Sequence, residues 1–185
     1  MRFLSTSVDG VHLVEIEAQS DERGSFARLY CPEEFAAAGI PFTPRQTSLS
    51  RNNRRLTLRG LHYTTEPEAK LVRCTRGRIF DVAVDVRAGS PTFRCWCGYE
   101  LDAVGARALY VPAGVAHGFL TLEDDCDVLY QIDRIYRPGF DAGLRWDDPA
   151  FAVAWPARPD VISSRDAAFP NSGEPLPRQP ASPSV

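Results

Sequence analysis

The stretch Ile79-Phe80-Asp81-Val82-Ala83-Val84-Asp85-Val86 is the strongest structural signal in this sequence. Side chains of an extended strand point alternately to its two faces, so the even-numbered residues, all apolar, share one face. The odd-numbered residues, which include both aspartates, share the other face. Residues 71–74 precede this stretch, and Thr75-Arg76-Gly77 lies between the two segments. The pattern predicts a β-hairpin over residues 71–86.

Similar short apolar segments fill the chain from Val11 to about Trp155, separated by Gly, Pro and Asp. We expect further strands at residues 60–63, 95–101, 108–111, 117–122 and 128–132. Residues 32–39 begin with Pro and two acids and end with Gly, as short helices do. The chain is therefore expected to be all-β, a sandwich or barrel with minor peripheral helices.

Composition bounds the size and setting of the protein. A chain of 185 residues with 44% hydrophobic content forms one core, so we expect a single domain over residues 1–170. Residues 171–185 are rich in Pro and Ser and are expected to be poorly ordered. The formal net charge of -3, with no basic stripe, argues against a nucleic-acid partner. No leader-like segment or long apolar run is present, so we expect a cytoplasmic protein without a membrane partner.

The cysteines and histidines do not predict a metal site. Five cysteines without CxxC spacing indicate buried thiols rather than disulfides or a zinc site. The segment Pro112-x-Gly114-x-x-His117 resembles the second half of the cupin signature, but His62 is followed by Tyr63-Thr64 instead of the second histidine of the first half. His12 lies in a separate N-terminal strand and is interpreted as structural. Spacing therefore assembles no set of three metal ligands.

Three side chains are candidates for proton chemistry. Strand alternation places His62 on the face opposite its two neighbours, toward a possible barrel cavity. Tyr130 shares a face with apolar residues, where a phenol needs a polar partner or acts as one. Lys70 is the single lysine among 21 basic residues. Imidazole and phenol suit proton removal next to a carbonyl, with the ammonium near the enolate oxygen, although each of these residues also fits a structural role.

Five segments resemble, in order and spacing, the dTDP-4-dehydrorhamnose 3,5-epimerase family. They are residues 59–63, 69–73, 77–93, 111–119 and 143–149. The resemblance covers about residues 21–166. It implies a cupin-type jelly-roll barrel that works without a metal or cofactor, and a homodimer that exchanges N-terminal strands. The implied substrate is a nucleotide diphosphate 4-keto-6-deoxy sugar, epimerised at C3, at C5 or at both.

The same resemblance implies roles for individual residues. His62 resembles the proton acceptor of the family, and Asp166 resembles the acid that orients it. Tyr130 resembles the proton donor on the opposite face of the sugar. Lys70 and His117 resemble the polar groups around the sugar and its enolate oxygen.

Binding residues are implied in the same way. Tyr136 resembles the ring that stacks on the base, and Gln46 stands where a base-contacting glutamine is expected. Arg23 and Arg59 resemble contacts to the diphosphate and nucleotide, for which a guanidinium is well suited.

Several positions depart from the family pattern, mostly in substrate recognition. Arg28 stands where the family usually has Glu, Ser48 belongs to a Thr-Ser pair in place of Asp-Asn, and Asp141 replaces a Glu. Ala167 replaces a lysine, and an aromatic pair is reduced to Ile135-Tyr136. Exchanging a carboxylate for a guanidinium changes the local charge by two units beside an anionic ligand. We therefore expect retained chemistry on a substrate other than the common rhamnose precursor.

Three alternatives remain open from the sequence. The barrel could catalyse 3,4-ketoisomerisation, it could bind a sugar nucleotide without catalysis, or it could be a metal-dependent cupin enzyme.

Overall fold

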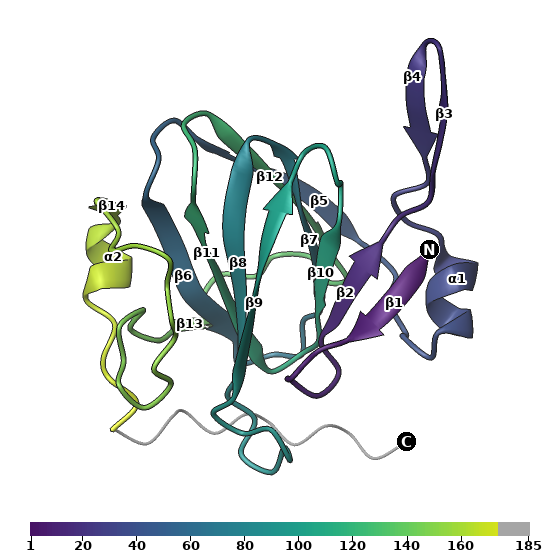
Figure 1. The fold of residues 1–185 in the computed structure, drawn as a ribbon. Helices are drawn as coiled ribbons and strands as arrows, with labels where there is room; N and C mark the ends of the chain where they lie inside the picture. The colour runs from purple at the N-terminus through teal and green to yellow at the C-terminus, as the bar shows by residue number, and fades with distance from the viewer. Residues whose placement is uncertain (174–185) are drawn as a thin grey trace.

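The computed structural model describes residues 1–173, which form strands and two short helices (Figure 1). The strands are β1 Arg2–Ser5, β2 His12–Glu15, β3 Ala18–Asp21, β4 Gly24–Ala27, β5 Gln46–Asn52, β6 Thr57–Thr64, β7 Lys70–Arg76, β8 Arg78–Asp85, β9 Trp96–Asp102, β10 Ala108–Val111, β11 Val115–Thr121, β12 Cys126–Ile132, β13 Asp141–Gly143 and β14 Val161–Ile162. The helices are α1 Pro32–Ala37 and α2 Ser164–Ala167.

Two sheets face each other and form the body of the molecule. Sheet 1 has the order β1-β2-β10-β7-β12-β5. Sheet 2 has the order β13-β6-β11-β8-β9, and β14 adds to β6 as its parallel neighbour. All other pairings are antiparallel. The predicted all-β jelly roll is confirmed, although the two sheets are not joined into a closed barrel.

The space between the sheets is filled by apolar side chains from both. Val72 and Val128 of sheet 1 pack with Ile79, Ala83 and Phe119 of sheet 2, and all five are fully buried. Burial of this kind contributes roughly 25 cal/mol per Å² of apolar surface. The interior therefore serves as the main core and fixes the positions of polar residues that point the same way.

The alternation predicted for residues 79–86 is confirmed, but the predicted hairpin is wrong. Strand β8 sends Ile79 and Ala83 into the core, while Val82 and Val84 pack on the outer face of sheet 2. Strand β7, however, belongs to sheet 1 and pairs with β10 and β12. Gly77, with a φ of 74°, turns the chain from one sheet to the other. A short turn at a barrel corner uses the same residue types as a hairpin turn, so the sequence did not distinguish them.

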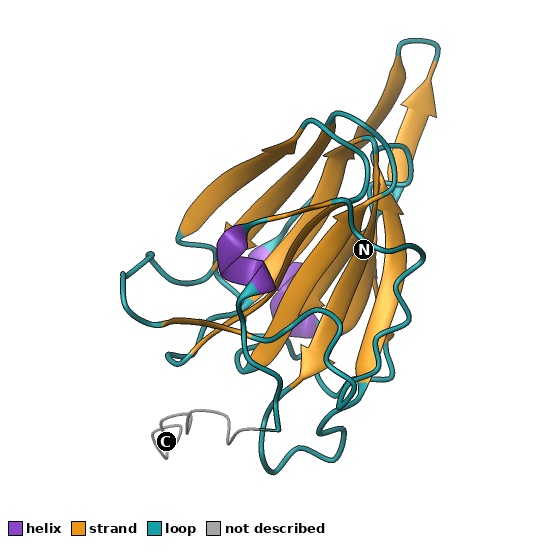
Figure 2. Cartoon of the chain, turned by 90° about the vertical axis from the view of Figure 1, so that its left-hand side faces the viewer, coloured by secondary structure: helices purple, strands orange, loops and turns teal. Residues whose placement is uncertain are grey.

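The helices lie outside the sheets (Figures 1 and 2). Helix α1, confirmed within residues 32–39, buries Phe35 against Phe42 and Tyr110 beside sheet 1. Helix α2 lies beside β6 and was not predicted, because four residues carry no periodic signal. Neither helix in residues 1–173 has the length or apolar character needed to cross a lipid bilayer.

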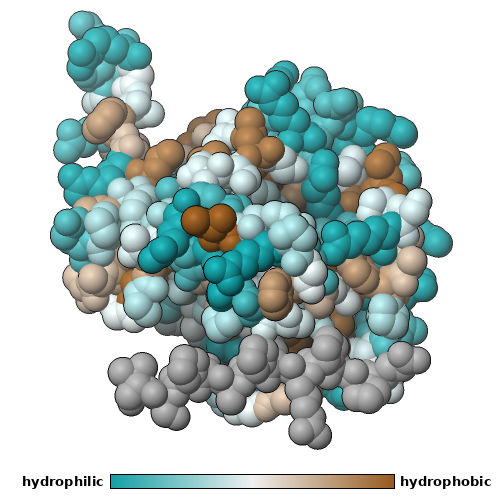
Figure 3. Space-filling view, turned by 180° about the vertical axis from the view of Figure 1, so that it is seen from behind, coloured by the Kyte–Doolittle hydropathy of each residue, from teal (hydrophilic) through white to brown (hydrophobic). Residues whose placement is uncertain are grey.

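The hairpin of β3 and β4 projects from the body (Figures 1 and 3). Phe26, on β4 of this hairpin, is 81% exposed. The remainder of the face seen in Figure 3 is mostly hydrophilic, with scattered apolar side chains. The projecting hairpin therefore has almost no apolar cover within a single chain.

Two compositional predictions need qualification. Cys74, Cys97 and Cys126 are buried as expected, but Cys31 is half-buried and Cys95 is exposed. The predicted tail begins within the packed part of the chain, because the Ser172 N–H donates a hydrogen bond to a carboxylate of the body. Residues 174–185 lie outside the described residues, and the single domain over residues 1–170 stays a prediction.

Candidate active site

Two histidines are neighbours on adjacent strands of sheet 2. His62 on β6 and His117 on β11 are paired in register. Their chain neighbours Leu61 and Ala116 pack on the outer face of the sheet, so both imidazoles point inward. His117 is buried, whereas 41% of the His62 side chain is exposed. A ligand can therefore reach His62 directly.

Each imidazole is bonded to a buried carboxylate. His62 Nε2 lies 2.8 Å from Asp166 Oδ1, and His117 Nε2 lies 2.8 Å from Asp81 Oδ1. Asp166 also accepts the Gly60 N–H at 3.1 Å. Each imidazole is therefore anchored at Nε2, His62 by Asp166 and His117 by Asp81.

The protonation of Asp166 determines which nitrogen of His62 is basic. Burial alone would raise the pKa of Asp166, but the hydrogen bond and charge of His62, with the Gly60 N–H, lower it below its ordinary value. An ionised carboxylate only accepts hydrogen bonds, so Nε2 of His62 carries the donated proton. In the neutral ring Nδ1 is then unprotonated and available as a base.

A bulge in β6 brings Arg59 to the same face as His62. Across the bulge, His62 pairs with His117 but Arg59 pairs with Phe119, so three residues of β6 span two of β11. Strict alternation would have placed Arg59 on the opposite face. The Arg59 Nε–H donates to Asn52 Oδ1 at 2.7 Å, which holds the guanidinium near the interior.

Tyr130 approaches from sheet 1. Its ring centroid lies 5.8 Å from that of His117, with the ring planes at 84°. No residue of the described chain forms a hydrogen bond to its hydroxyl. Burial, followed by the charge of Asp81, raises the pKa of Tyr130 well above its ordinary value, and the charge of Arg59 lowers it only in part. The phenol therefore keeps its proton at neutral pH.

Lys70 lies on the inner face of sheet 1. It alternates along β7 with Leu71 and shares its face with Val72, which is part of the core. It is 9% exposed, and its Nζ lies 3.4 Å from Glu68 Oε1. The ammonium of Lys70 is thus nearly buried between the sheets, with the Glu68 carboxylate beside it.

Four of the remaining predicted binding residues lie at the edge of this region: Gln46, Ser48, Tyr136 and Asp141. On β5, Gln46 pairs with Ile132 and Ser48 pairs with Tyr130. Gln46 Oε1 accepts the Tyr136 N–H at 2.8 Å, and the Tyr136 hydroxyl donates to Asp141 Oδ2 at 3.1 Å.

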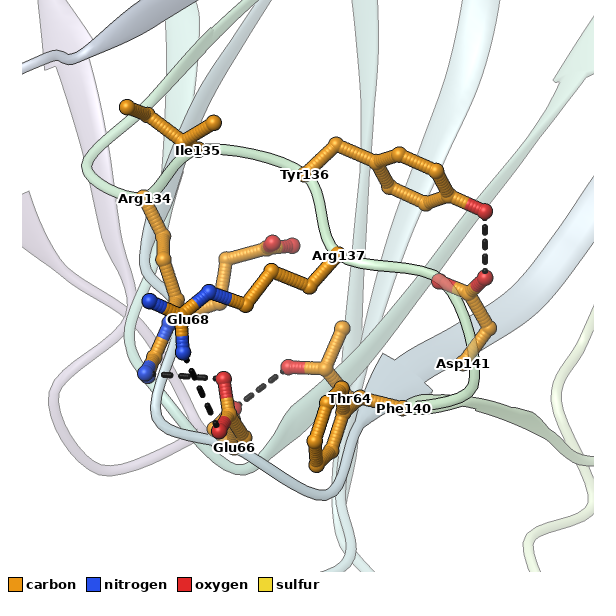
Figure 4. Close-up of a pocket in the computed structure, with 9 residues that line it drawn as sticks. All are labelled: Thr64, Glu66, Glu68, Arg134, Ile135, Tyr136, Arg137, Phe140 and Asp141. Carbon is orange, nitrogen blue, oxygen red and sulfur yellow. Dashed lines mark hydrogen bonds and ion pairs between the residues drawn. The ribbon is translucent and has the colours of Figure 1, made fainter.

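A small pocket lies between the β6–β7 connection and the loop before β13. Figure 4 shows Tyr136 and Asp141 on one side of it and the ion pair of Glu66 with Arg134 on the other. The Tyr136 side chain is largely exposed at the rim of this pocket.

Arg23 and Arg28 are not brought to the histidines within the chain. Arg23 binds Asp21 inside the projecting hairpin, with the guanidinium Nε 3.1 Å from Oδ2. Arg28 binds Glu34 of α1 at 3.0 Å. In Figure 1 the hairpin extends away from β6 and α2.

Comparison with known proteins identifies the family of this chain. The sequence model of the dTDP-4-dehydrorhamnose 3,5-epimerase family matches residues 5–174. The chain belongs to this family.

Epimerase relatives are similar over most of their length. A dTDP-4-dehydrorhamnose 3,5-epimerase of Methanothermobacter thermautotrophicus is 43% identical over 84% of each chain. A dTDP-4-dehydrorhamnose 3-epimerase of Streptomyces niveus is 38% identical over 90% of this chain and 81% of that protein.

Solved epimerases share the fold. A 4-keto-6-deoxy sugar epimerase from the novobiocin gene cluster of Streptomyces spheroides superposes with a TM-score of 0.88 at 36% identity, covering 94% of this chain and 88% of that chain. A dTDP-6-deoxy-D-glucose-3,5-epimerase of Legionella pneumophila, in complex with dTDP-4-keto-L-rhamnose, gives a TM-score of 0.88 at 34% identity and covers 93% of both chains.

The structure of this epimerase-family chain also identifies residues that sequence reasoning missed. Asp81 was predicted only to share a face of its strand with Ile79 and Ala83, and its contact with His117 was not predicted. A carboxylate on an otherwise apolar inward face was the available signal. Glu68 was missed because no spacing rule identifies a partner for Lys70. Within residues 1–173, no group of three or more His, Cys, Asp or Glu side chains is arranged to hold a metal ion.

Proposed function

We propose that this protein is an epimerase that inverts C3, C5 or both in a nucleotide diphosphate 4-keto-6-deoxy sugar. The observation that carries the proposal is the pairing of two carboxylate-bound imidazoles on one sheet with a protonated phenol on the facing sheet. An acid and a base on different walls of one interior suit removal of a proton from one face of a sugar and its return to the other.

The chemistry requires only proton transfers. The C4 ketone of the substrate acidifies the C–H bonds at C3 and C5. Nδ1 of His62 takes the proton, the C–H electron pair forms the enolate, and Asp166 stabilises the resulting imidazolium. Lys70 and His117 stabilise the enolate oxygen. Tyr130 then protonates the same carbon from the opposite face, which inverts it.

No resident metal or cofactor enters this proposal, because the substrate's own ketone supplies the carbon acidity. Five free cysteines fit a reducing compartment, and we place the protein in the cytoplasm. Neither a nucleic acid nor a membrane is needed as a partner.

Substrate binding is assigned to the edge of the interior. Arg59 contacts the diphosphate, Gln46 and Ser48 contact the nucleotide, and Tyr136, held by Asp141, stacks on the base. Solved relatives have been crystallised with dTDP-4-keto-L-rhamnose and with dTDP-quinovose, which supports a thymidine diphosphate sugar as the first ligand to test.

We infer a homodimer as the working form. Arg23 and Arg28 lie at a projecting hairpin and do not reach the histidines of their own chain. The same two arginines contact the ligand if the hairpin extends toward the site of a second copy.

Solvent deuterium exchange tests the function. We expect the protein to incorporate deuterium at C3 or C5 of dTDP-4-keto-6-deoxyglucose in D₂O, followed by NMR. His62→Ala should abolish incorporation, whereas His12→Ala, a change at the histidine distant from the site, should not. Normal exchange in His62→Ala would refute the assignment of the base. Migration of the carbonyl from C4 to C3 would identify a ketoisomerase, and binding without exchange would identify a binding protein.

The nucleotide is found by thermal-shift measurements with dTDP, UDP, CDP and GDP, because a ligand that binds the native state raises its stability with the logarithm of ligand excess. The substitutions represented by Arg28, Ser48 and Asp141 predict that the preferred sugar differs from the common rhamnose precursor. Comparing initial rates among related 4-keto sugars tests this part separately.

A further inference from the structure

The ring of Phe169, a residue that the mechanism above does not use, lies against the proposed base. The ring centroids of Phe169 and His62 are 5.9 Å apart, and the ring planes meet at 75°. Rings at this distance and angle make an edge-to-face contact, which stabilises one relative orientation of the pair. The contact therefore restrains the plane of the imidazole.

Two further contacts fix Phe169 itself. The Arg165 guanidinium lies 5.8 Å from the Phe169 ring centroid, within the range of a cation–π contact. On another side the ring lies over Gly143, which pairs with His62 in register. A Cβ at Gly143 would come within 2.2 Å of a Phe169 ring carbon, so only glycine leaves room for the ring.

The segment that carries Phe169 is anchored before and after the ring. Ser163 Oγ accepts the Asp166 N–H at 3.0 Å and caps α2. Asp166 is bonded to His62. Beyond Phe169, the Ser172 N–H donates to the buried side chain of Asp148. Phe169 is thus held in place by the same short segment that supplies the carboxylate partner of His62.

One hydrogen bond does not fix the orientation of an imidazole. The bond between Nε2 and Asp166 leaves the ring free to turn about the bond axis, which would move Nδ1. An edge contact on the ring removes this freedom. We infer that Phe169 is a positioning residue for His62, which holds the imidazole so that Nε2 meets Asp166 while Nδ1 is presented to the substrate. The inference rests on the proposed function for its effect on catalysis.

Mutant kinetics test the inference through non-additivity. We expect Phe169→Ala to lower kcat about tenfold with less than about a twofold change in KM, because misplacing a base affects the transition state more than binding. In an Asp166→Ala background the same change should have less than about a twofold effect, because the geometry that Phe169 maintains is already lost.

Gly143→Ala perturbs the contact between Phe169 and His62 from the Gly143 side of the Phe169 ring. It should reproduce the loss seen in Phe169→Ala, because the new methyl group displaces the ring. The variant that combines Gly143→Ala with Phe169→Ala should have the same kcat as Phe169→Ala alone, since removing the ring makes room for the methyl group.

Phe93→Ala is the matched control. Phe93 also lies beside an arginine, with the Arg94 guanidinium 5.3 Å from its ring centroid, but it lies in the connection between β8 and β9. This variant should leave kcat unchanged. Additive effects of Phe169→Ala and Asp166→Ala, or an increase in KM alone, would overturn the inference and assign Phe169 to substrate contact or to general stability.

A readout without catalysis separates this inference from the proposed function. The imidazole NMR signals of His62 are assigned by their loss in His62→Ala. We expect them to shift and broaden in Phe169→Ala and to stay unchanged in Phe93→Ala. If they respond in this way but the wild-type protein exchanges no deuterium, the proposed function fails and the positioning role stands. If they do not respond, the positioning role is wrong.

Discussion

The phenol of Tyr130 is held without a hydrogen-bond partner from the described chain, in a setting that opposes its ionisation. Burial is the main cause that raises its pKa, the charge of Asp81 adds to it, and Arg59 only partly offsets both. A group in this state donates a proton and does not remove one. The environment of Tyr130 thus fits the acid role proposed for it, and differs from that of His62, the proposed base, whose Nδ1 is free to accept a proton.

Tyr130→Phe separates the two halves of the reaction. Without the hydroxyl, proton removal by His62 continues but protonation from the opposite face does not. We expect formation of the epimer to fall about 10²–10⁴-fold, the usual contribution of a general acid, with a smaller loss in deuterium exchange. Parallel NMR measurements of exchange and product check this. An equal loss in both would show that Tyr130 acts on the first proton transfer or on the fold.

The sequence predicted the position of a residue well when only local geometry was involved, and poorly when its partner lay far along the chain. Alternation placed His62 and Tyr130 on inward faces, as the structure has them, because it needs only local geometry. The bond between His62 and Asp166 spans 104 positions, and only the family resemblance suggested it. Arg59 was named from the family resemblance alone, because a bulge shifts the alternation at this point of β6 and no local rule locates a bulge.

Strands β6 and β11 approach closely where the bulge occurs. Gly60 has a φ of 133°, and a Cβ built on it would lie 2.6 Å from the Gly118 Cα. Both the backbone angle and the space therefore require glycine. This approach lies two residues before His62 and sets the course of the strand that carries it.

Gly60→Ala should destabilise the fold by about 2–4 kcal/mol, because it combines an unfavourable backbone angle with overpacking against main-chain atoms. Gly89→Ala, where no atom lies within 4 Å of the new Cβ, is the control and should change stability by less than about 0.5 kcal/mol. Chemical denaturation measures both. Equal stability of the two variants would refute the close approach.

A buried carboxylate organises the turn after β8. Asp85 accepts hydrogen bonds from the Arg87 guanidinium at 2.8 and 2.9 Å and from Thr92 Oγ1 at 2.6 Å. Burial alone would raise the pKa of Asp85, but these bonds and that from Ser90 lower it to about 2. Since the folded pKa lies below the unfolded value, the stabilisation is present above about pH 4 and is lost as the pH falls toward about 2.

Asp85→Asn should therefore lower the free energy of unfolding by about 2 kcal/mol at pH 7, the equivalent of the pKa shift. The difference from wild type should shrink between about pH 4 and pH 2, because protonation removes the same charge from Asp85. Exposed Asp160 is the control position, and Asp160→Asn should change the free energy of unfolding by less than about 0.5 kcal/mol at pH 7. Urea unfolding at several pH values measures the effect, and a pH-independent difference would contradict it.

Whole elements were predicted where burial imposed a pattern and missed where it did not. Strands β8, β10 and β12 lie in the core and were found from period-two apolar residues. The exposed strands β3 and β4 were missed, because both are largely polar. The predicted pairing of β7 with β8 failed for a different reason, because sheet membership depends on contacts far along the chain.

At the level of the molecule, the proposed acid and base come from different sheets. His62 belongs to sheet 2 and Tyr130 to sheet 1, so the two groups meet only when the sheets pack on the common core. The core thus positions the site as well as stabilising the fold. The two predicted arginines at the hairpin lie outside this arrangement, and in the proposed homodimer a second chain contributes them.

Mixing two inactive variants tests whether the hairpin completes the site of a partner. In a homodimer of this kind, a chain with His62→Ala still supplies Arg23 to its partner, and a chain with Arg23→Ala still supplies His62. Random mixing of the two should restore about a quarter of wild-type activity, since half of the dimers are mixed and each has one intact site. Phe26→Asp, which places a charge on the exposed ring of the hairpin, should weaken the dimer in light scattering and lower the recovery. If each hairpin instead served its own chain, no mixed dimer would contain an intact site and mixing would restore nothing.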